Sequence, residues 1–174
     1  MKRLSSQLIF CSPEQVLRNT VVEINNDGVV SRLIDLQHQQ TETAHTLFFD
    51  GLISAGIVSL KSEISDREIN AIKKDYNYID LSANTNISFT SDEPLIIDFG
   101  TKDYHLINKI LSENSSFFQS VNMYKIISGC TYYPLALLNK REQIRILDQP
   151  QLTLWQNLDF ANKHLLAQTR IKQL

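Results

Sequence analysis

Lys61 and Glu63 are the residues whose position is most suggestive of chemistry. They end the stretch "FFDGLISAGIVSLKSE" (residues 48–63). This stretch holds a hydrophobic run, the turn glycine Gly56 and a second apolar run, and then Lys61 and Glu63, which are separated by a single residue. That separation suits a pair of metal ligands. A lysine ammonium, however, has no free lone pair at neutral pH and repels a divalent cation, and a single glutamate does not make a closed site. The stretch therefore predicts the frame of a metal site without its ligands.

Other residue types that carry out catalysis form no recognisable set. The sequence has no H-x-H, H-x-x-E-H or H-E-x-x-H pattern, no G-x-S-x-G motif and no Gly-rich phosphate loop. Cys130 follows a glycine but has no evident base beside it, so a buried, unreactive thiol is expected. Asp92 and Glu93 precede Pro94 and are expected to be turn residues. Solvated or structural roles are expected for the histidines, which are His38, His45, His105 and His164.

Short strands are expected to dominate the first third of the chain, which would position these residues. Apolar and β-branched runs cover residues 7–12 and 20–24. Asn26-Asp27-Gly28 then gives a strong hairpin signal, because glycine accepts the positive φ of a tight turn. Residues 46–60 contain two further apolar runs, separated at Asp50-Gly51. This part shows no helical periodicity, so the pattern predicts a meander of strands.

The middle of the chain mixes helices with short strands, and the tail returns to strands. Helices are expected over residues 65–76 (with Ser65 or Asp66 as N-cap), 102–114, 121–129 and 134–138. Strands are expected over residues 78–83, 87–91, 94–100, 143–149, 151–159 and 169–174. The simplest closure pairs the tail strands with the N-terminal strands in one β-sandwich, with the mixed middle packed on one side.

The two ends of the chain resemble the amidohydrolase superfamily, in its chlorohydrolase and cytosine-deaminase-like branch. The resemblance lies in "NNDGVV", "TLFFDG" and "LISAGIVSLKSE" near the N-terminus, and in "KIISGCTYYPLALL", "QIRILDQPQLTLWQNLDF" and "TRIKQL" near the C-terminus. It covers residues 1–63 and 121–174. In that family a small composite β-sandwich is built from both chain ends, and a metal-binding (β/α)₈ barrel lies between them.

Carried over residue by residue, the resemblance implies that the metal site is lost. The family's Pro-Gly turn has Ala55 here in place of proline, whereas Gly56 is kept. The Asp or Asn before the ligands is Ser59, and the two histidine ligands fall on Lys61 and Glu63. The matched ends are separated by roughly 60 residues, whereas an eight-stranded barrel needs roughly 200 or more. A barrel therefore cannot be present between them.

The expected fold is mainly β, of the α+β class, in a single compact unit. Residues 1–63 and 121–174 would form the composite β-sandwich, and residues 64–120 an α/β insertion in place of the barrel. We expect the insertion to fold back over the sandwich face that a barrel would cover, helped by a homodimer contact, because exposed apolar area is unfavourable. The adjacent aromatic pairs Phe117-Phe118 and Tyr132-Tyr133 also indicate an oligomer surface.

The function that the resemblance implies is that of a non-catalytic, amidohydrolase-related protein, a pseudoenzyme with a structural or interaction role. No catalytic residue, metal or cofactor is expected. Two alternatives stay open: a small-molecule-binding or regulatory module with a pocket between sandwich and insertion, and a metal-free enzyme. The family's closing aspartate would correspond to Lys102 of "FGTKD". The candidate pocket residues are Lys61, Glu63, Lys102 and His105, and a related full-length hydrolase is a candidate partner.

Composition excludes several classes of partner. The 174 residues carry a net charge of −2 without a basic block, which argues against nucleic-acid binding, and 43% are apolar, which is enough for a core. No segment approaches the ~20 apolar residues of a membrane span, and the N-terminal apolar run is too short for a signal peptide. Cys11 and Cys130 have no CxxC partner, which indicates free thiols in a reducing compartment. A cytoplasmic protein is expected.

Overall fold

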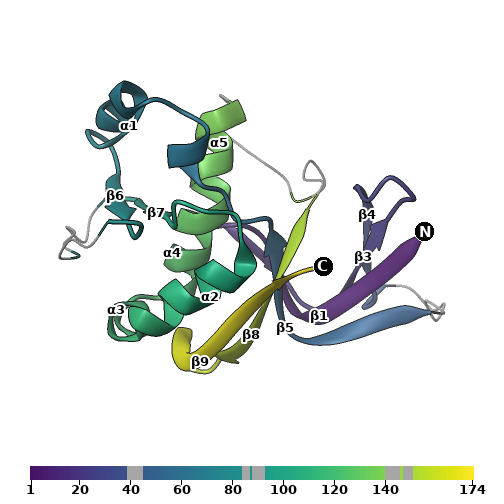
Figure 1. Cartoon of the computed structure of the whole chain (residues 1–174). Helices are drawn as coiled ribbons and strands as arrows, with labels where there is room; N and C mark the ends of the chain where they lie inside the picture. The colour runs from purple at the N-terminus through teal and green to yellow at the C-terminus, as the bar shows by residue number, and fades with distance from the viewer. Residues whose placement is uncertain (39–44, 84–86, 88–92, 140–145, 147–150) are drawn as a thin grey trace.

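The computed structural model describes residues 1–38, 45–83, 87, 93–139, 146 and 151–174. A mixed sheet has the strand order β4-β3-β1-β5-β8-β9, with β2 also paired to β1, and a small parallel sheet joins β6 to β7 (Figure 1). The strands are β1 (Lys2–Ser12), β2 (Gln15–Leu17), β3 (Thr20–Ile24), β4 (Val30–Asp35), β5 (Thr46–Ala55), β6 (Asn77–Asp80), β7 (Leu95–Asp98), β8 (Leu152–Asp159) and β9 (His164–Gln173).

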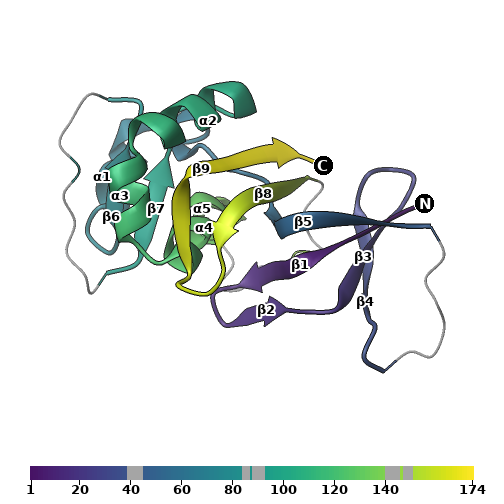
Figure 2. The same cartoon turned by 90° about the horizontal axis from the view of Figure 1, so that it is seen from below.

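The helices lie in the middle of the chain and gather at one end of the molecule, whereas β3 and β4 lie at the other end (Figure 2). They are α1 (Asp66–Ile72), α2 (Tyr104–Glu113), α3 (Ser115–Ser120), α4 (Met123–Ile127) and α5 (Tyr133–Asn139), with a 3₁₀ turn over Leu60–Ser62 and a π-helical segment over Ser128–Tyr132. The fold is mainly β, of the α+β class, as predicted. None of the helices in the described part of the chain is long and apolar enough to cross a lipid bilayer.

The two chain ends meet where β5 pairs with β8. Leu52–Ala55 runs antiparallel to Leu152–Trp155, and β9 adds on the far side of β8. The buried indole Nε1 of Trp155 donates a hydrogen bond to Ser54 Oγ across this pairing, at 2.9 Å. Strands from both ends of the chain therefore belong to one continuous hydrogen-bonded sheet.

Two predictions for the N-terminal strands are wrong. The strands do not form a simple meander, because β1 lies between β3, to which it is antiparallel, and β5, to which it is parallel. Asp50-Gly51 does not separate two strands either, since β5 runs through it. Gly51 has a φ of +142°, and a Cβ at this position would collide with the carbonyl oxygen of Trp155. Glycine here therefore allows β8 to approach β5 rather than turning the chain.

Each face of the sheet carries its own hydrophobic cluster. Leu52 and Trp155 belong to the cluster that the sheet shares with the helices, and Ile53 and Leu154 to the cluster on the other face. Neighbouring residues thus alternate between the clusters, as the period-2 geometry of a strand requires. Other members of the helix-side cluster are Phe99, Ile107, Phe118, Ile126, Cys130 and Ile171, and other members of the opposite cluster are Leu4, Cys11, Val22, Val30 and Ile146.

The middle of the chain packs onto the C-terminal strand through α2 and α3. The side-chain amide of Asn108 on α2 donates to the carbonyl of Ile171 at 2.9 Å and accepts from its N–H at 2.8 Å, so it pairs with β9 as a neighbouring strand would. α3 was not predicted from the sequence. Asn114-Ser-Ser ends α2 as expected, but a second helix begins at Ser115 and buries Phe118.

The helical region after residue 121 is continuous, whereas two separate helices were expected over 121–129 and 134–138. The π-helical segment joins α4 to α5, and Gly129 within it packs against β7. A Cβ on Gly129 would lie 2.7 Å from the carbonyl oxygen of Leu95. The last strand begins earlier than expected, at His164 instead of residue 169. The strands expected over 87–91 and 143–149 lie outside the described residues, except at Ile87 and Ile146.

Gly51→Ala is expected to destabilise the protein by about 3 kcal/mol or more, because the new Cβ must displace the backbone of β8. Gly28→Ala is the matched control: its φ of +81° is also positive, but a Cβ there meets nothing within 4 Å. The Gly28→Ala substitution should lower the free energy of unfolding by about 1 kcal/mol. Urea unfolding of both variants measures the difference, and equal losses would contradict this account of Gly51.

Candidate functional site

The fully buried carboxylate of Asp98, at the carboxyl end of β7, is the centre of a polar cluster. Ser59 Oγ and the backbone N–H of Gly100 both donate to Oδ1 at 2.9 Å. The backbone N–H of Lys61 donates to Oδ2 at 2.7 Å, and the hydroxyl of Tyr78 donates to the same oxygen at 2.6 Å. Burying a carboxylate is costly unless hydrogen bonds replace its water, and these four donors do so.

Distant parts of the chain form this cluster. β6 and β7 are parallel and in register, which sets Asp80 opposite Asp98 at their carboxyl ends. The segment that follows β5 passes the same ends. Gly100 reverses the chain with a φ of +68°, and a Cβ on it would lie 2.5 Å from the Cβ of Ser82. Because ligands in α/β proteins bind outside the carboxyl ends of parallel strands, this cluster is the first candidate for a functional site.

The side chain of Lys61 forms a second layer over the buried carboxylate. Its Nζ donates to Asp80 Oδ2 at 2.9 Å and to Ser82 Oγ at 3.1 Å. The hydrogen bond and the charge of Asp80 raise the pKa of Lys61. Burial alone would raise the pKa of Asp80, but hydrogen bonds from Ser82 and Lys61 outweigh it and the pKa falls below its ordinary value. At neutral pH Lys61 and Asp80 are therefore a charged pair.

Tyr78 is a hydrogen-bond donor rather than a base. Burial, followed by the hydrogen bond to Asp98, raises the pKa of its phenol far above the ordinary value. The phenol therefore keeps its proton throughout the physiological range and uses it to hold the carboxylate of Asp98.

The geometry leaves no coordination position for a metal on Asp98. An ionised carboxylate offers about four lone-pair sites, and four donors already reach the two oxygens of Asp98. The ammonium of Lys61 adds a positive charge nearby. Within the described ranges, no group of three or more His, Cys, Asp or Glu side chains could hold a metal ion.

The cluster also lacks an activated nucleophile. Ser82 lies 3.1 Å from a lysine nitrogen, as in a serine–lysine pair, but its hydroxyl donates instead to Asp80 at 2.5 Å. Because the pKa of Lys61 is raised, its ammonium has no lone pair with which to accept the serine proton. These hydrogen bonds hold the segment after β5, the strand β6 and the strand β7 in fixed positions relative to one another. Lys61 cannot act as the base for Ser82 in this arrangement.

The four predicted pocket residues lie in different places. Glu63 and Lys102 form an ion pair at 2.5 Å and line one hollow of about 330 Å³ between the segment that follows β5 and α5. Lys61 points to Asp80 instead. His105, on α2, lines a separate hollow with Asn108 and Arg170. The structure therefore brings together Glu63 and Lys102. The remaining lining residues of the Glu63–Lys102 hollow are Gly56, Ile57, Val58, Leu135, Leu138 and Gln151.

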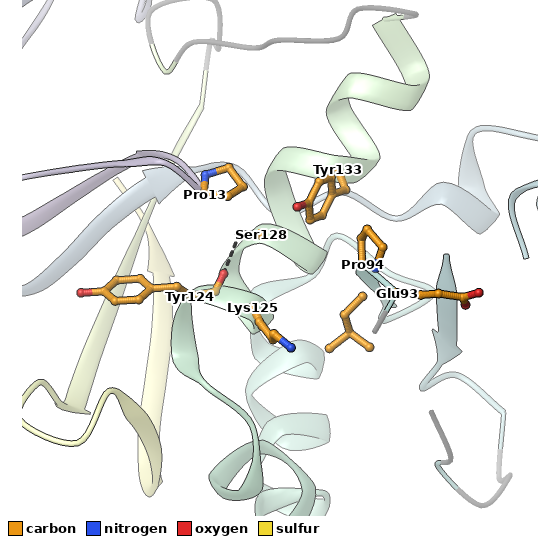
Figure 3. Close-up of a pocket in the computed structure, with 8 residues that line it drawn as sticks. Pro13, Glu93, Pro94, Tyr124, Lys125, Ser128 and Tyr133 are labelled. Atoms are coloured by element: carbon orange, nitrogen blue, oxygen red, sulfur yellow. Dashed lines mark hydrogen bonds between the residues drawn. The ribbon is translucent and has the colours of Figure 1, made fainter. Parts of the chain in front are cut away.

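A further hollow of about 310 Å³ lies beside the π-helical segment (Figure 3). Its two charged side chains, Lys125 and Glu93, point in different directions (Figure 3). The hydroxyl of Ser128 donates to the carbonyl of Tyr124 at 2.6 Å, so its proton is already used. Polar groups do not converge on one point in this hollow. Its remaining lining residues are Pro13, Pro94, Leu95 and Tyr133.

Asp98, Tyr78 and Ser59 were not among the predicted site residues. One signal could have indicated Asp98: it directly follows the apolar run Leu95-Ile96-Ile97, which is buried throughout. A carboxylate at the end of a buried strand must accept several hydrogen bonds. Its position in the sequence therefore indicates that donors from other segments lie around it. Tyr78 and Ser59 give no comparable signal, because both depend on pairings between segments far apart in the sequence.

The cysteines and the remaining histidines have structural surroundings. Cys11 and Cys130 are free and buried, as predicted, and burial raises the pKa of Cys11 to about 11 and that of Cys130 well above its ordinary value. His38 lies 3.7 Å from Asp35 at the surface, and His45 is exposed. His164 Nδ1 lies 3.1 Å from the carbonyl oxygen of residue 121.

Comparison with known proteins gives no match among family models, curated proteins or solved structures.

Asp98→Asn is expected to lower the free energy of unfolding by about 3 kcal/mol, because an amide NH₂ would face donors that now bind a carboxylate oxygen. Asp80→Asn, in the more exposed ion pair beside it, should cost several-fold less. Urea unfolding at neutral pH compares the two variants. Equal losses would show that the four hydrogen bonds to Asp98 do not organise this region.

The Lys61–Asp80 pair is expected to give a stability difference between wild type and Asp80→Asn that depends on pH. The folded-state pKa of Asp80 lies below its ordinary 3.8, so its contribution is present above that value and is lost as pH falls through the lowered pKa. The pKa of Lys61 is raised above 10.5, so its contribution is lost only as pH rises through the raised value. Urea unfolding at several pH values between about 3 and 9 gives the free energy of unfolding of both proteins. The difference between wild type and Asp80→Asn should be constant over most of this range and should decrease only at the acid end.

Proposed function

We propose that this protein is a non-catalytic, amidohydrolase-related protein with a structural or interaction role. The observation that carries the proposal is the state of Asp98. This carboxylate meets the segment where the resemblance places the family's metal ligands, yet protein donors occupy its oxygens. Lys61, in the place of the first ligand, is paired with Asp80. Lys61, and the carboxylate of Asp98 beside it, thus take part in holding the fold.

The arrangement of the chain ends supports the amidohydrolase relationship. Both ends contribute to one sheet through the β5–β8 pairing, as in the family's composite domain. Lys102, which the resemblance set in the place of the closing aspartate, pairs with Glu63. The aspartate that reaches the segment after β5 is Asp98. Asp98 belongs to the strand β7, and its oxygens accept hydrogen bonds from Ser59 and Lys61 of this segment.

A small-molecule-binding or regulatory module is the second candidate. The observation that favours it is the hollow of about 330 Å³, because Lys102 of the expected insertion and residues from both chain ends line it together. Its remaining lining is largely apolar, which suits a compact ligand with one polar group. The two buried free thiols accord with a cytoplasmic location. The candidate partner, a related full-length hydrolase, rests on the resemblance.

Elemental analysis tests the leading proposal. Protein purified without chelator, incubated with Zn²⁺, Fe²⁺ or Mn²⁺ and then desalted, is expected to hold far less than one metal per chain, because Asp98 offers no free lone pair. Asp98→Asn is the matched control and should give the same metal content. About one equivalent in the wild type that disappears in Asp98→Asn would overturn the proposal, because it would show that this carboxylate binds metal.

A further inference from the structure

The first half of β5 has an open edge. Residues 46–49 pair with β1 on one side, and β8 pairs with β5 only from Leu52 onward. Figures 1 and 2 both show this half of β5 extending beyond β8. Among the described residues, no strand pairs with its other side. Backbone N–H and C=O groups of an edge strand are available to another strand.

Large apolar side chains accompany this open edge. Phe48 is 66% exposed and Leu47 is 52% exposed, whereas Leu52 and Ile53 farther along the same strand are fully buried. Successive residues of a strand point to opposite faces. Apolar surface is therefore exposed on both faces of the sheet at the open edge. An exposed apolar edge strand is a site of association.

The other edges of the sheet are protected. The amide of Asn108 occupies the backbone N–H and C=O of Ile171 on β9. β4 presents the exposed polar residues Ser31 and Arg32. Helix cover and charged side chains are the usual means by which soluble proteins prevent edge pairing. Within the described part of the chain, no strand pairs with this side of residues 47–50, and the segment itself holds no basic residue. The ammonium of Lys172 on β9 lies 5.5 Å from the centre of the Phe49 ring.

We propose that this edge of β5 pairs in antiparallel fashion with the same edge of a second copy of the chain, with Phe48 opposite the partner's Phe48. A two-fold axis through that pair sets Leu47 opposite the partner's Phe49, so every central position places an apolar side chain beside an apolar one. Asp50 falls opposite the partner's Thr46, so no like charges meet. An isologous interface requires such self-complementarity.

The register centred on Phe49 does not have this property. Centring the pairing on Phe49 would set Phe48 opposite the partner's Asp50, and Leu47 opposite the partner's Gly51. An apolar side chain would then face a carboxylate, and another would face a residue with no side chain. Since directly opposed side chains provide much of the pairing energy of strands, the register centred on Phe48 is favoured. The proposal goes beyond the proposed function and does not depend on it.

Disulfide trapping tests the register. In an antiparallel pair, directly opposite Cα atoms lie about 4.5 or 5.5 Å apart, and both distances allow a disulfide. Phe48→Cys should therefore form a covalent dimer on mild oxidation. Leu47→Cys is the matched control: it is similarly exposed, but two copies of residue 47 would lie about 7–8 Å apart on the diagonal, too far for ready bridging. Cys11 and Cys130 are buried and do not compete.

Phe48→Cys is expected to cross-link about tenfold faster than Leu47→Cys, and reductant should reverse the product. Equal rates, or faster linking of Leu47→Cys, would overturn the register. Sedimentation tests the interface without cysteine: the wild type should dimerise at concentrations on the order of 10⁻⁴ M, and Phe48→Lys should be monomeric. Leu106→Lys, which replaces another exposed apolar residue on α2, should dimerise like the wild type.

A charge swap completes the test. Phe48→Glu alone should be monomeric, because like charges would meet at the axis, and mixing it with Phe48→Lys should restore a dimer that contains one copy of each. A wild type that sediments as a monomer at this concentration would overturn the proposal. So would a Phe48→Lys variant that dimerises as well as the wild type, because it would place the interface on another surface.

Discussion

The removal of one carboxylate from water constrains the middle of this molecule. Asp98 ends a buried strand, and an unpartnered buried carboxylate would cost several kcal/mol. β7 can end there only if hydroxyl and backbone donors from the segment after β5, from β6 and from the turn at Gly100 arrive together. These four hydrogen bonds therefore fix β5, β6 and β7 relative to one another.

The same geometry decides between two uses of a carboxylate. A metal ligand needs a lone pair that faces an open coordination position, whereas a structural carboxylate has donors on both oxygens. Asp98 is of the second kind, and the nearby ammonium of Lys61, paired with Asp80, has no lone pair to offer a metal. The hydrogen bonding of Asp98 therefore serves to hold the fold together.

Local signals predicted the parts of this fold that depend on near neighbours. Ser65 caps α1, Asn26-Asp27-Gly28 joins β3 to β4, and the tail strands pair with an N-terminal strand. The parallel pairing of β1 with β5 could not be predicted from local patterns. Such patterns favour antiparallel pairing between strands that follow one another in the sequence, whereas three strands lie between β1 and β5. The cluster around Asp98 was missed for the same reason: hydrogen bonds that join residues 20 to 39 positions apart exist only once the sheets have formed.

The two buried thiols give this fold an internal reporter of its own opening. Cys11 lies in the cluster on one face of the sheet and Cys130 in the cluster on the helix side. A thiol reagent can reach either sulfur only when the cluster around it opens, and burial also keeps both thiols protonated. The ratio of the two modification rates therefore tells whether the faces of the sheet separate independently or lose their packing in one cooperative event.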